Sequence, residues 1–276
     1  MTVVFTLIVL TDGWLDGAIS PNPADNSAVQ GTVLAGLIAV LIALAQIEFA
    51  NLISLRKFNH FTLAATAGSI LTATCWYWPQ IIDVSPGRML AYTLAGVTIL
   101  FFLFQYFRHG TEGVVANCSA GLFSVIYLGI MSSFVLAVRI EFGVFELLMF
   151  VFVVKSSDIG AYTAGKLFGR HKFSPNISPA KSWEGLAGGI IFAAAIAFCF
   201  AAIFDIMQWW LAIIFAAVFT FLGQLSDLAE SMIKRDAGLK DASARVPGFG
   251  GILDVVDSLL MAAPAAYLFF LAIRVL

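Results

Sequence analysis

Residues 31–54 read GTVLAGLIAVLIALAQIEFANLIS, and this stretch decides the fold class. Glu48 is its only charged residue. A bilayer core about 30 Å thick requires about 20 apolar residues in a helix, so the stretch predicts a transmembrane helix. Apolar runs separated by polar breaks predict nine such helices, at about 1–10, 31–54, 61–82, 88–107, 114–137, 142–165, 185–204, 208–233 and 252–274.

The overall composition agrees with this interpretation. The chain has 276 residues, of which 61% are hydrophobic and 12% charged, and its mean hydropathy is +0.95. Too few charges are present to cover a soluble globular surface, which excludes that class. A net charge of −2 provides no basic surface for nucleic acid. We therefore predict an all-α, polytopic integral membrane protein that forms a single transmembrane domain over residues 1–276.

Basic residues are distributed unevenly between the two ends of the predicted helices. Only Arg88, Arg139 and Arg274 fall on one side. The other side has Arg56, Lys57, Arg108, Lys155, Lys166, Arg170, Lys172, Lys181, Lys234, Arg235, Lys240 and Arg245. The positive-inside rule predicts that this second side is cytoplasmic, with the N-terminus inside and the C-terminus outside. The longest polar connections, 166–184 and 234–251, lie on the same side, so we expect the chemistry at the cytoplasmic membrane surface.

The helix predicted at 208–233 ends in a row of polar residues. Asp227, Ser231 and Lys234 are spaced i, i+4 and i+7, which places them on one helical face. A carboxylate, a hydroxyl and an ammonium in this row can hold a metal ion and a phosphate together, and charges within a span generally mark function. The alternative is a solvated helix end with an Asp–Lys pair.

A glycine-rich connection leads into the last predicted helix. Residues 247–251 read PGFGG, which breaks a helix and lets backbone N–H groups approach a ligand closely. Asp254 and Asp257 follow at i and i+3 near the helix N-terminus. Such carboxylates can complement the positive end of the helix dipole. They also suit Mg²⁺, which is usually held by one or two carboxylates together with substrate phosphates.

The other long polar connection contains Ser178-Pro-Ala-Lys181-Ser182-Trp183-Glu184-Gly185. Ser178 or Ser182 can cap the following helix, and Trp183 fits a membrane-interface aromatic residue. This structural interpretation leaves Lys181 and Glu184 unexplained.

Several charged residues fall inside predicted spans. Lys155 and Asp158 are spaced i, i+3 and can neutralise each other within the membrane. Glu48 and Glu146 have no motif around them, and we assign them no role.

Three stretches, taken in order, resemble a known family. They are Asp158-Ile-Gly-Ala161-Tyr162, the run Ser178–Gly185, and the run from Ser231 through Lys234, Arg235, Lys240, Asp241 and Pro247–Gly251 to Asp254 and Asp257. Together they resemble the conserved stretches of phosphatidate cytidylyltransferases, also called CDP-diacylglycerol synthases. They cover most of residues 155–258.

The resemblance implies transfer of a cytidylyl group from CTP to phosphatidate, with a catalytic C-terminal half at about 155–260 and residues 1–154 as scaffold. It implies catalytic roles for Lys234, Arg235, Lys240 and Asp241. Substrate binding falls to Ser231, Ser178, Lys181, Asp158, Gly250 and Gly251. The metal ligands would be Asp227, Asp254 and Asp257, for Mg²⁺ with or without a second cation. A homodimer in the inner (plasma) membrane, with its active site facing the cytoplasm, is expected.

Two positions depart from the family pattern. Phe249 stands where the family usually has His, and Val255 where it usually has Arg, which removes a cation beside the two aspartates. The alternatives are a cytidylyltransferase for another lipid phosphate, a membrane transporter and an inactive relative. The spacing of Gly185 and Gly189 fits close helix packing, which would suit a dimer interface.

Overall fold

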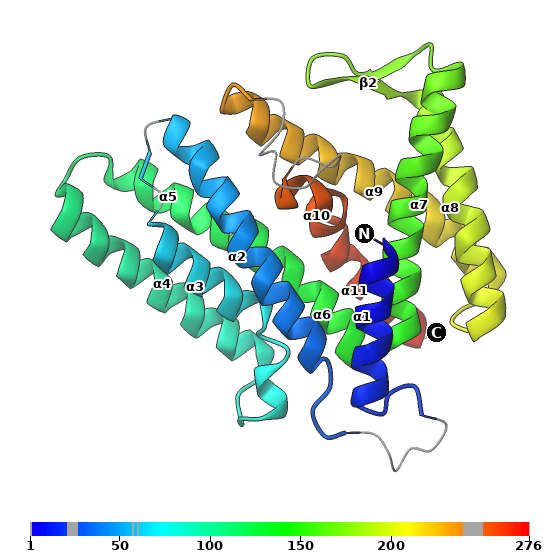
Figure 1. Ribbon diagram of the computed structural model, residues 1–276, viewed down its shortest axis with the longest axis horizontal. Helices are drawn as coiled ribbons and strands as arrows, with labels where there is room; N and C mark the ends of the chain where they lie inside the picture. The colour runs from blue at the N-terminus through cyan, green and yellow to red at the C-terminus, as the bar shows by residue number, and fades with distance from the viewer. Residues whose placement is uncertain (1, 21–26, 57, 60, 240–250, 276) are drawn as a thin grey trace.

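The protein is described by a computed structural model that covers residues 2–20, 27–56, 58–59, 61–239 and 251–275. Figure 1 shows a bundle of helices that run back and forth, with a small β-hairpin at its upper edge. The helices are α1 (Thr2–Leu15), α2 (Thr32–Leu55), α3 (Thr62–Ala73), η2 (Trp78–Gln80), α4 (Pro86–His109), α5 (Val114–Ser124), η3 (Val125–Ile130), α6 (Met131–Glu141), α7 (Val144–Phe168), α8 (Trp183–Phe204), α9 (Trp209–Asp236), α10 (Ile252–Leu260) and α11 (Ala262–Val275). The strands are β1 (Lys172–Ser174) and β2 (Ser178–Ser182).

Each of the nine predicted segments contains helix, so the predicted helical membrane class is confirmed. By length and composition, six helical stretches in the described residues can cross a membrane: Thr32–Leu55, Pro86–His109, Val114–Glu141, Trp183–Phe204, Trp209–Asp236 and Ile252–Arg274. The helices α1 and α3 are shorter, with 14 and 12 residues. Helix α7 has 25 residues but carries Glu146, Lys155 and Asp158. The predicted number of nine crossings is therefore not confirmed.

Two segments that were predicted as single regular helices are interrupted. Between α5 and α6 the chain passes through the π-helical turn η3. The last segment breaks at Met261 into α10 and α11. Pro264 lies in the first turn of α11, and because proline has no N–H it cannot donate to the carbonyl of Leu260. The third segment is also shorter than predicted, since α3 ends at Ala73.

The β-hairpin is the one departure from an all-helical fold within the described residues. Strands β1 and β2 pair antiparallel and lie beyond the ends of α7 and α8 (Figure 1). Ser182 caps α8, because its Oγ accepts the N–H of Gly185 at 3.1 Å. The Glu184 carboxylate accepts the backbone N–H groups of Arg170 and His171, each at 3.2 Å. The capping expected of Ser182 is confirmed, and Glu184 has a structural role in holding the hairpin.

Glycines allow α7 and α8 to pack closely. A Cβ on Gly185 would lie 2.9 Å from the Ala161 carbonyl oxygen, and a Cβ on Gly189 would lie 2.9 Å from that of Ser157. On α7, a Cβ on Gly160 would be 2.8 Å from the Gly188 carbonyl oxygen. The glycine pair on α8 therefore packs inside this chain, and it gives no support to a dimer interface.

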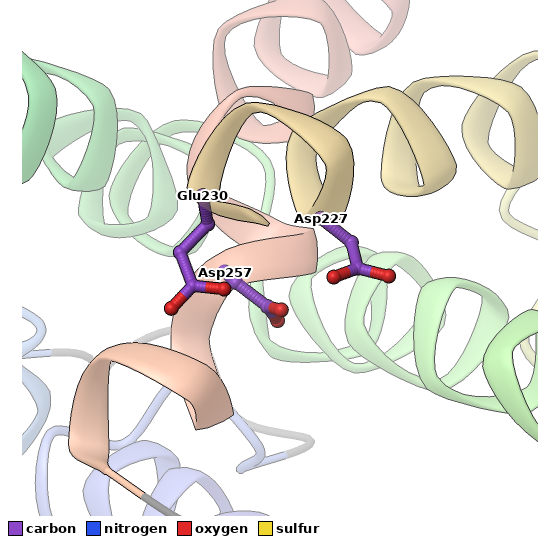
Figure 2. Close-up of side chains that lie close together, drawn as sticks. All are labelled: Asp227, Glu230 and Asp257. Atoms are coloured by element: carbon purple, nitrogen blue, oxygen red, sulfur yellow. The ribbon is translucent and has the colours of Figure 1, made fainter. Parts of the chain in front are cut away.

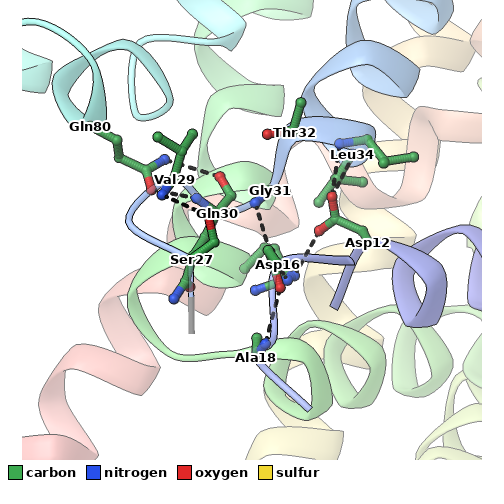
Figure 3. A network of polar contacts seen from close by, with 12 residues as sticks. Asp12, Asp16, Ala18, Ser27, Val29, Gln30, Gly31, Thr32, Leu34 and Gln80 are labelled. Carbon is green, nitrogen blue, oxygen red and sulfur yellow. Dashed lines mark hydrogen bonds and ion pairs between the residues drawn. The ribbon is translucent and has the colours of Figure 1, made fainter. Parts of the chain in front are cut away.

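A buried ion cluster fixes the N-terminal helix, and Figure 3 shows its two carboxylates, Asp12 and Asp16, beside the start of α2. Arg139 of α6 has no exposed surface, and its guanidinium lies 3.0 Å from Asp12 and 2.6 Å from Asp16. Asp12 also accepts the N–H of Val33 at 2.8 Å, and Asp16 accepts that of Gly31 at 3.1 Å. Since breaking a buried ion pair costs about 3–5 kcal/mol, the cluster holds α1 firmly against α2 and α6.

Candidate active site

A cavity of about 690 Å³ lies between α7, β2, α8, α9 and α10, with α1 and α2 contributing to its wall. Its lining combines two kinds of side chain. Apolar groups come from Phe5, Leu41, Val151 and Leu259, among others. The charged groups are those of Lys155, Asp158, Lys181, Asp227, Asp254 and Asp257. A cavity with this composition can accept a ligand that is charged at one end and apolar at the other.

Three carboxylates converge where α9 packs on α10, as Figure 2 shows. Oxygen atoms of Asp227, Glu230 and Asp257 all lie within 4.8 Å of one another. Glu230 is fully buried, and its Oε1 has no hydrogen-bond partner among the residues that the structure describes. The two helices are held in register by Ser226, whose hydroxyl donates to the Asp257 carbonyl and accepts the N–H of Met261 at 3.1 Å. This cluster contains two of the three predicted metal ligands and adds Glu230.

Lys234 lies beside the cluster and connects it to the start of α10. Its ammonium is 2.5 Å from Glu230 Oε2 and 2.5 Å from Asp254 Oδ1. The other Asp254 oxygen accepts the N–H of Gly251 at 2.6 Å, which caps α10. Asp254 thus lines the cavity while bonded to Lys234, and its role as a metal ligand stays a prediction.

The hairpin brings Lys181 to Asp227, a different carboxylate of the cluster from the one that Lys234 contacts. Its ammonium lies 2.6 Å from Asp227 Oδ2 and donates to the carbonyl of Gln224 at 2.9 Å. The Gln224 amide in turn donates to Asp158 at 3.4 Å. These contacts join β2, α9 and α7, and they place Lys181, which the sequence left unexplained, in the wall of the cavity.

The remaining predicted site residues are placed differently from one another. Ser231 is half-buried on α9, and Arg235 is exposed with its guanidinium 3.4 Å from the Leu239 carbonyl oxygen. Ser178 lines the cavity, and Gly251 is the residue that precedes α10. Lys240, Asp241 and Gly250 lie outside the described residues, as does Phe249.

Glu48, to which the sequence assigned no role, takes part in positioning α10. It is fully buried on α2, and its Oε2 accepts the N–H of Leu253 at 3.0 Å. Phe49 and Leu52 of α2 pack in one apolar cluster with Leu253 and Leu260 of α10. A carboxylate at a helix N-terminus is favoured by the helix dipole. The signal that could have found Glu48 is its charge inside a span.

We expect Glu48→Ala to destabilise the protein by about 1–3 kcal/mol, because the buried Leu253 N–H would lose its acceptor. The measurement is the midpoint of thermal unfolding in detergent. Glu48→Gln keeps an acceptor oxygen, so its unfolding midpoint should fall less. Glu112→Ala, at an exposed position, serves as a control. An unchanged midpoint in Glu48→Ala would show that the contact does not hold α10.

The sequence profile of the cytidylyltransferase family matches residues 27–273. The chain belongs to this family. It is 33% identical to the phosphatidate cytidylyltransferase of Pseudomonas aeruginosa over 240 residues, which is 86% of this chain and 87% of that protein. It is 31% identical to that of Staphylococcus epidermidis over 241 residues, covering 83% of this chain and 88% of that protein. With the Haemophilus influenzae protein of the same name it shares 41% identity over 137 residues.

The predicted family is thus confirmed, although the lengths of the alignments differ. Within the cytidylyltransferase family, the chain spans about half the length of several curated relatives, namely 46% of the Haemophilus influenzae protein and 51% of the Mycobacterium bovis protein. The carboxylates of the cavity lie within the part that the family profile covers, whereas Thr2 and Phe5 of its lining precede that part.

The departure at Val255 can now be placed in the structure. Val255 lines the cavity, and its carbonyl accepts a hydrogen bond from Lys155 Nζ at 2.8 Å. An ammonium from α7 therefore lies beside the position at which α10 itself provides no cation. The predicted Lys155–Asp158 pair is longer, at 3.9 Å.

Proposed function

We propose that this chain transfers the cytidylyl group of CTP to phosphatidate, giving CDP-diacylglycerol and pyrophosphate. Its relatives in Pseudomonas aeruginosa and Staphylococcus epidermidis are phosphatidate cytidylyltransferases, which supports this activity. The observation that carries the proposal is the cavity, which combines a carboxylate cluster and lysine ammonium groups with an apolar wall. A lipid phosphate and a nucleoside triphosphate together require both charged groups for the phosphates and an apolar surface for the acyl chains.

In the proposed reaction, a phosphate oxygen of phosphatidate attacks the α-phosphorus of CTP. The bond from that phosphorus to the bridging oxygen breaks, and pyrophosphate leaves with the electron pair. The attacking oxygen is already anionic near neutral pH, so no general base is needed. The chain therefore has to position two polyanions and offset their charge. Lys181 suits this task because Asp227 and the Gln224 carbonyl fix its ammonium in the cavity wall.

We propose that Asp227, Glu230 and Asp257 hold Mg²⁺. Carboxylate oxygens are ligands that this hard cation prefers, and Oε1 of the buried Glu230, which has no hydrogen-bond partner within the described part of the chain, suits coordination of a cation. Among the described residues, the cavity and its adjoining wall bring together five carboxylates (Asp158, Asp227, Glu230, Asp254 and Asp257) and three ammonium groups (Lys155, Lys181 and Lys234). When bound, Mg²⁺ supplies positive charge to the phosphate oxygens of the nucleotide.

The topology belongs to the same proposal: nine crossings, with the N-terminus and the active site on the cytoplasmic side of the inner membrane. Support comes from α7, which is long enough to cross. Its Lys155 is directed to α10 rather than to lipid. We also propose a homodimer, for which the family resemblance is the only support.

The test is turnover by purified protein in mixed micelles with CTP, Mg²⁺ and phosphatidate. We expect pyrophosphate and CDP-diacylglycerol in equal amounts, and no pyrophosphate when diacylglycerol replaces phosphatidate. If another lipid phosphate gives a higher rate than phosphatidate, that lipid is the acceptor and the proposed substrate is wrong. Absence of pyrophosphate with every acceptor, from folded protein, would contradict the proposed function.

A further inference from the structure

Lys155 differs from the other lysines around the cavity in what it contacts. Lys181 lies 2.6 Å from a carboxylate, and Lys234 lies 2.5 Å from each of two. The Lys155 ammonium instead donates to two neutral groups on α10, the Val255 carbonyl at 2.8 Å and the Ser258 hydroxyl at 2.7 Å. Its nearest carboxylate contact, with Asp158, is 3.9 Å long. Of the lysines that line the described cavity, Lys155 is the one without a close carboxylate.

The two short hydrogen bonds also fix where the ammonium sits. An ammonium has three N–H donors, and α10 takes two of them. Ser258 is almost completely buried, whereas the Lys155 side chain is 26% exposed. The third donor is therefore held near the cavity surface. An anionic oxygen of a ligand could accept from it in a short, charge-assisted hydrogen bond.

Apolar side chains line the cavity together with Lys155. Val151 lies one turn earlier on the same face of α7, and both side chains line the cavity. Leu259 follows the Ser258 partner on α10, and Phe5 and Leu41 complete an apolar part of the lining from α1 and α2. A cation set among these groups suits a phosphate attached to acyl chains. CTP has no such apolar part.

We propose that Lys155 binds the phosphate monoester of the lipid substrate, and that Val255 and Ser258 hold its ammonium in place. This proposal rests on the proposed function. The competing interpretation is that Lys155 only joins α7 to α10. The two interpretations differ in what a neutral hydrogen-bond donor at position 155 should do.

The experiment compares Lys155→Met, Lys155→Gln and Lys155→Arg, with Lys166→Met as a control. Lys166 is exposed on the same helix and does not line the cavity. In mixed micelles, the mole fraction of phosphatidate is varied at saturating CTP, and CTP is then varied at fixed phosphatidate. We expect Met and Gln to raise the KM for phosphatidate tenfold or more while the KM for CTP changes less than twofold. In Lys155→Arg and in the control, the KM for phosphatidate should stay within threefold of the wild-type value.

Binding of a fluorescent phosphatidate without CTP provides a second readout, which also covers a variant that has no measurable turnover. Thermal unfolding shows whether each variant is folded. An unchanged phosphatidate KM and unchanged binding in folded Lys155→Met would overturn the proposal, as would a rise confined to the KM for CTP. Wild-type protein that binds phosphatidate in a Lys155-dependent way but releases no pyrophosphate would contradict the proposed function alone.

Discussion

Asp257→Asn is expected to lower kcat for CDP-diacylglycerol formation by about a hundred- to a thousandfold, the range found when a group that stabilises transition-state charge is removed. Asp257 brings the carboxylate of α10 to those of Asp227 and Glu230 on α9. Asparagine has nearly the same shape and keeps an oxygen that can accept the N–H of Ser258, which Asp257 Oδ1 accepts at 2.5 Å. The substitution therefore removes charge with little change in packing.

The variant should also require more Mg²⁺ for half-maximal rate, because an amide oxygen is a poorer ligand than a carboxylate. The measurement is the initial rate over a Mg²⁺ titration at saturating CTP and phosphatidate. Asp205→Asn is the matched control, since Asp205 is exposed with φ of 52°, a conformation that asparagine also tolerates. If Asp257→Asn keeps both kcat and the Mg²⁺ requirement within twofold of the wild type, the metal assignment is wrong.

The fold was predictable where apolar length alone decides it. The predicted helix at 31–54 agrees with α2, Thr32–Leu55, and that at 208–233 agrees with the beginning of α9 at Trp209. The break at Met261 was missed because the last apolar run continues through Pro264, and hydropathy does not register a missing N–H. The hairpin was missed because its strands are short and polar.

The site was predictable only in part, because spacing relates residues within one helix. The i, i+3 spacing placed Asp254 and Asp257 together on α10, and both line the cavity. No spacing could indicate that Lys181 reaches Asp227, or that Glu48 accepts an N–H of α10 from 205 residues away. These contacts depend on how α2, α9, α10 and the hairpin pack, which a single sequence does not specify.

Lys234→Met is expected to destabilise the protein by about 3–5 kcal/mol and to reduce turnover strongly. The Lys234 ammonium lies between the buried Glu230 and Asp254, at 2.5 Å from each. Methionine can fill most of the space but removes the ammonium that contacts both carboxylates in a poorly solvated site, and removing one partner is the costly case for a buried ion pair. The measurements are the thermal unfolding midpoint in detergent and kcat, with Lys166→Met as the stability control.

A double variant separates the ion pair from simple loss of packing. Glu230→Gln removes one of the two carboxylates that Lys234 neutralises, so Glu230→Gln with Lys234→Met should unfold at a higher temperature than Lys234→Met alone. If packing of the Lys234 methylene groups were the main contribution to stability, Glu230→Gln would lower the stability of Lys234→Met further. Turnover should remain low in the double variant, since Glu230 also belongs to the carboxylate cluster with Asp227 and Asp257. A double variant less stable than Lys234→Met would show that the three charges do not act as a unit.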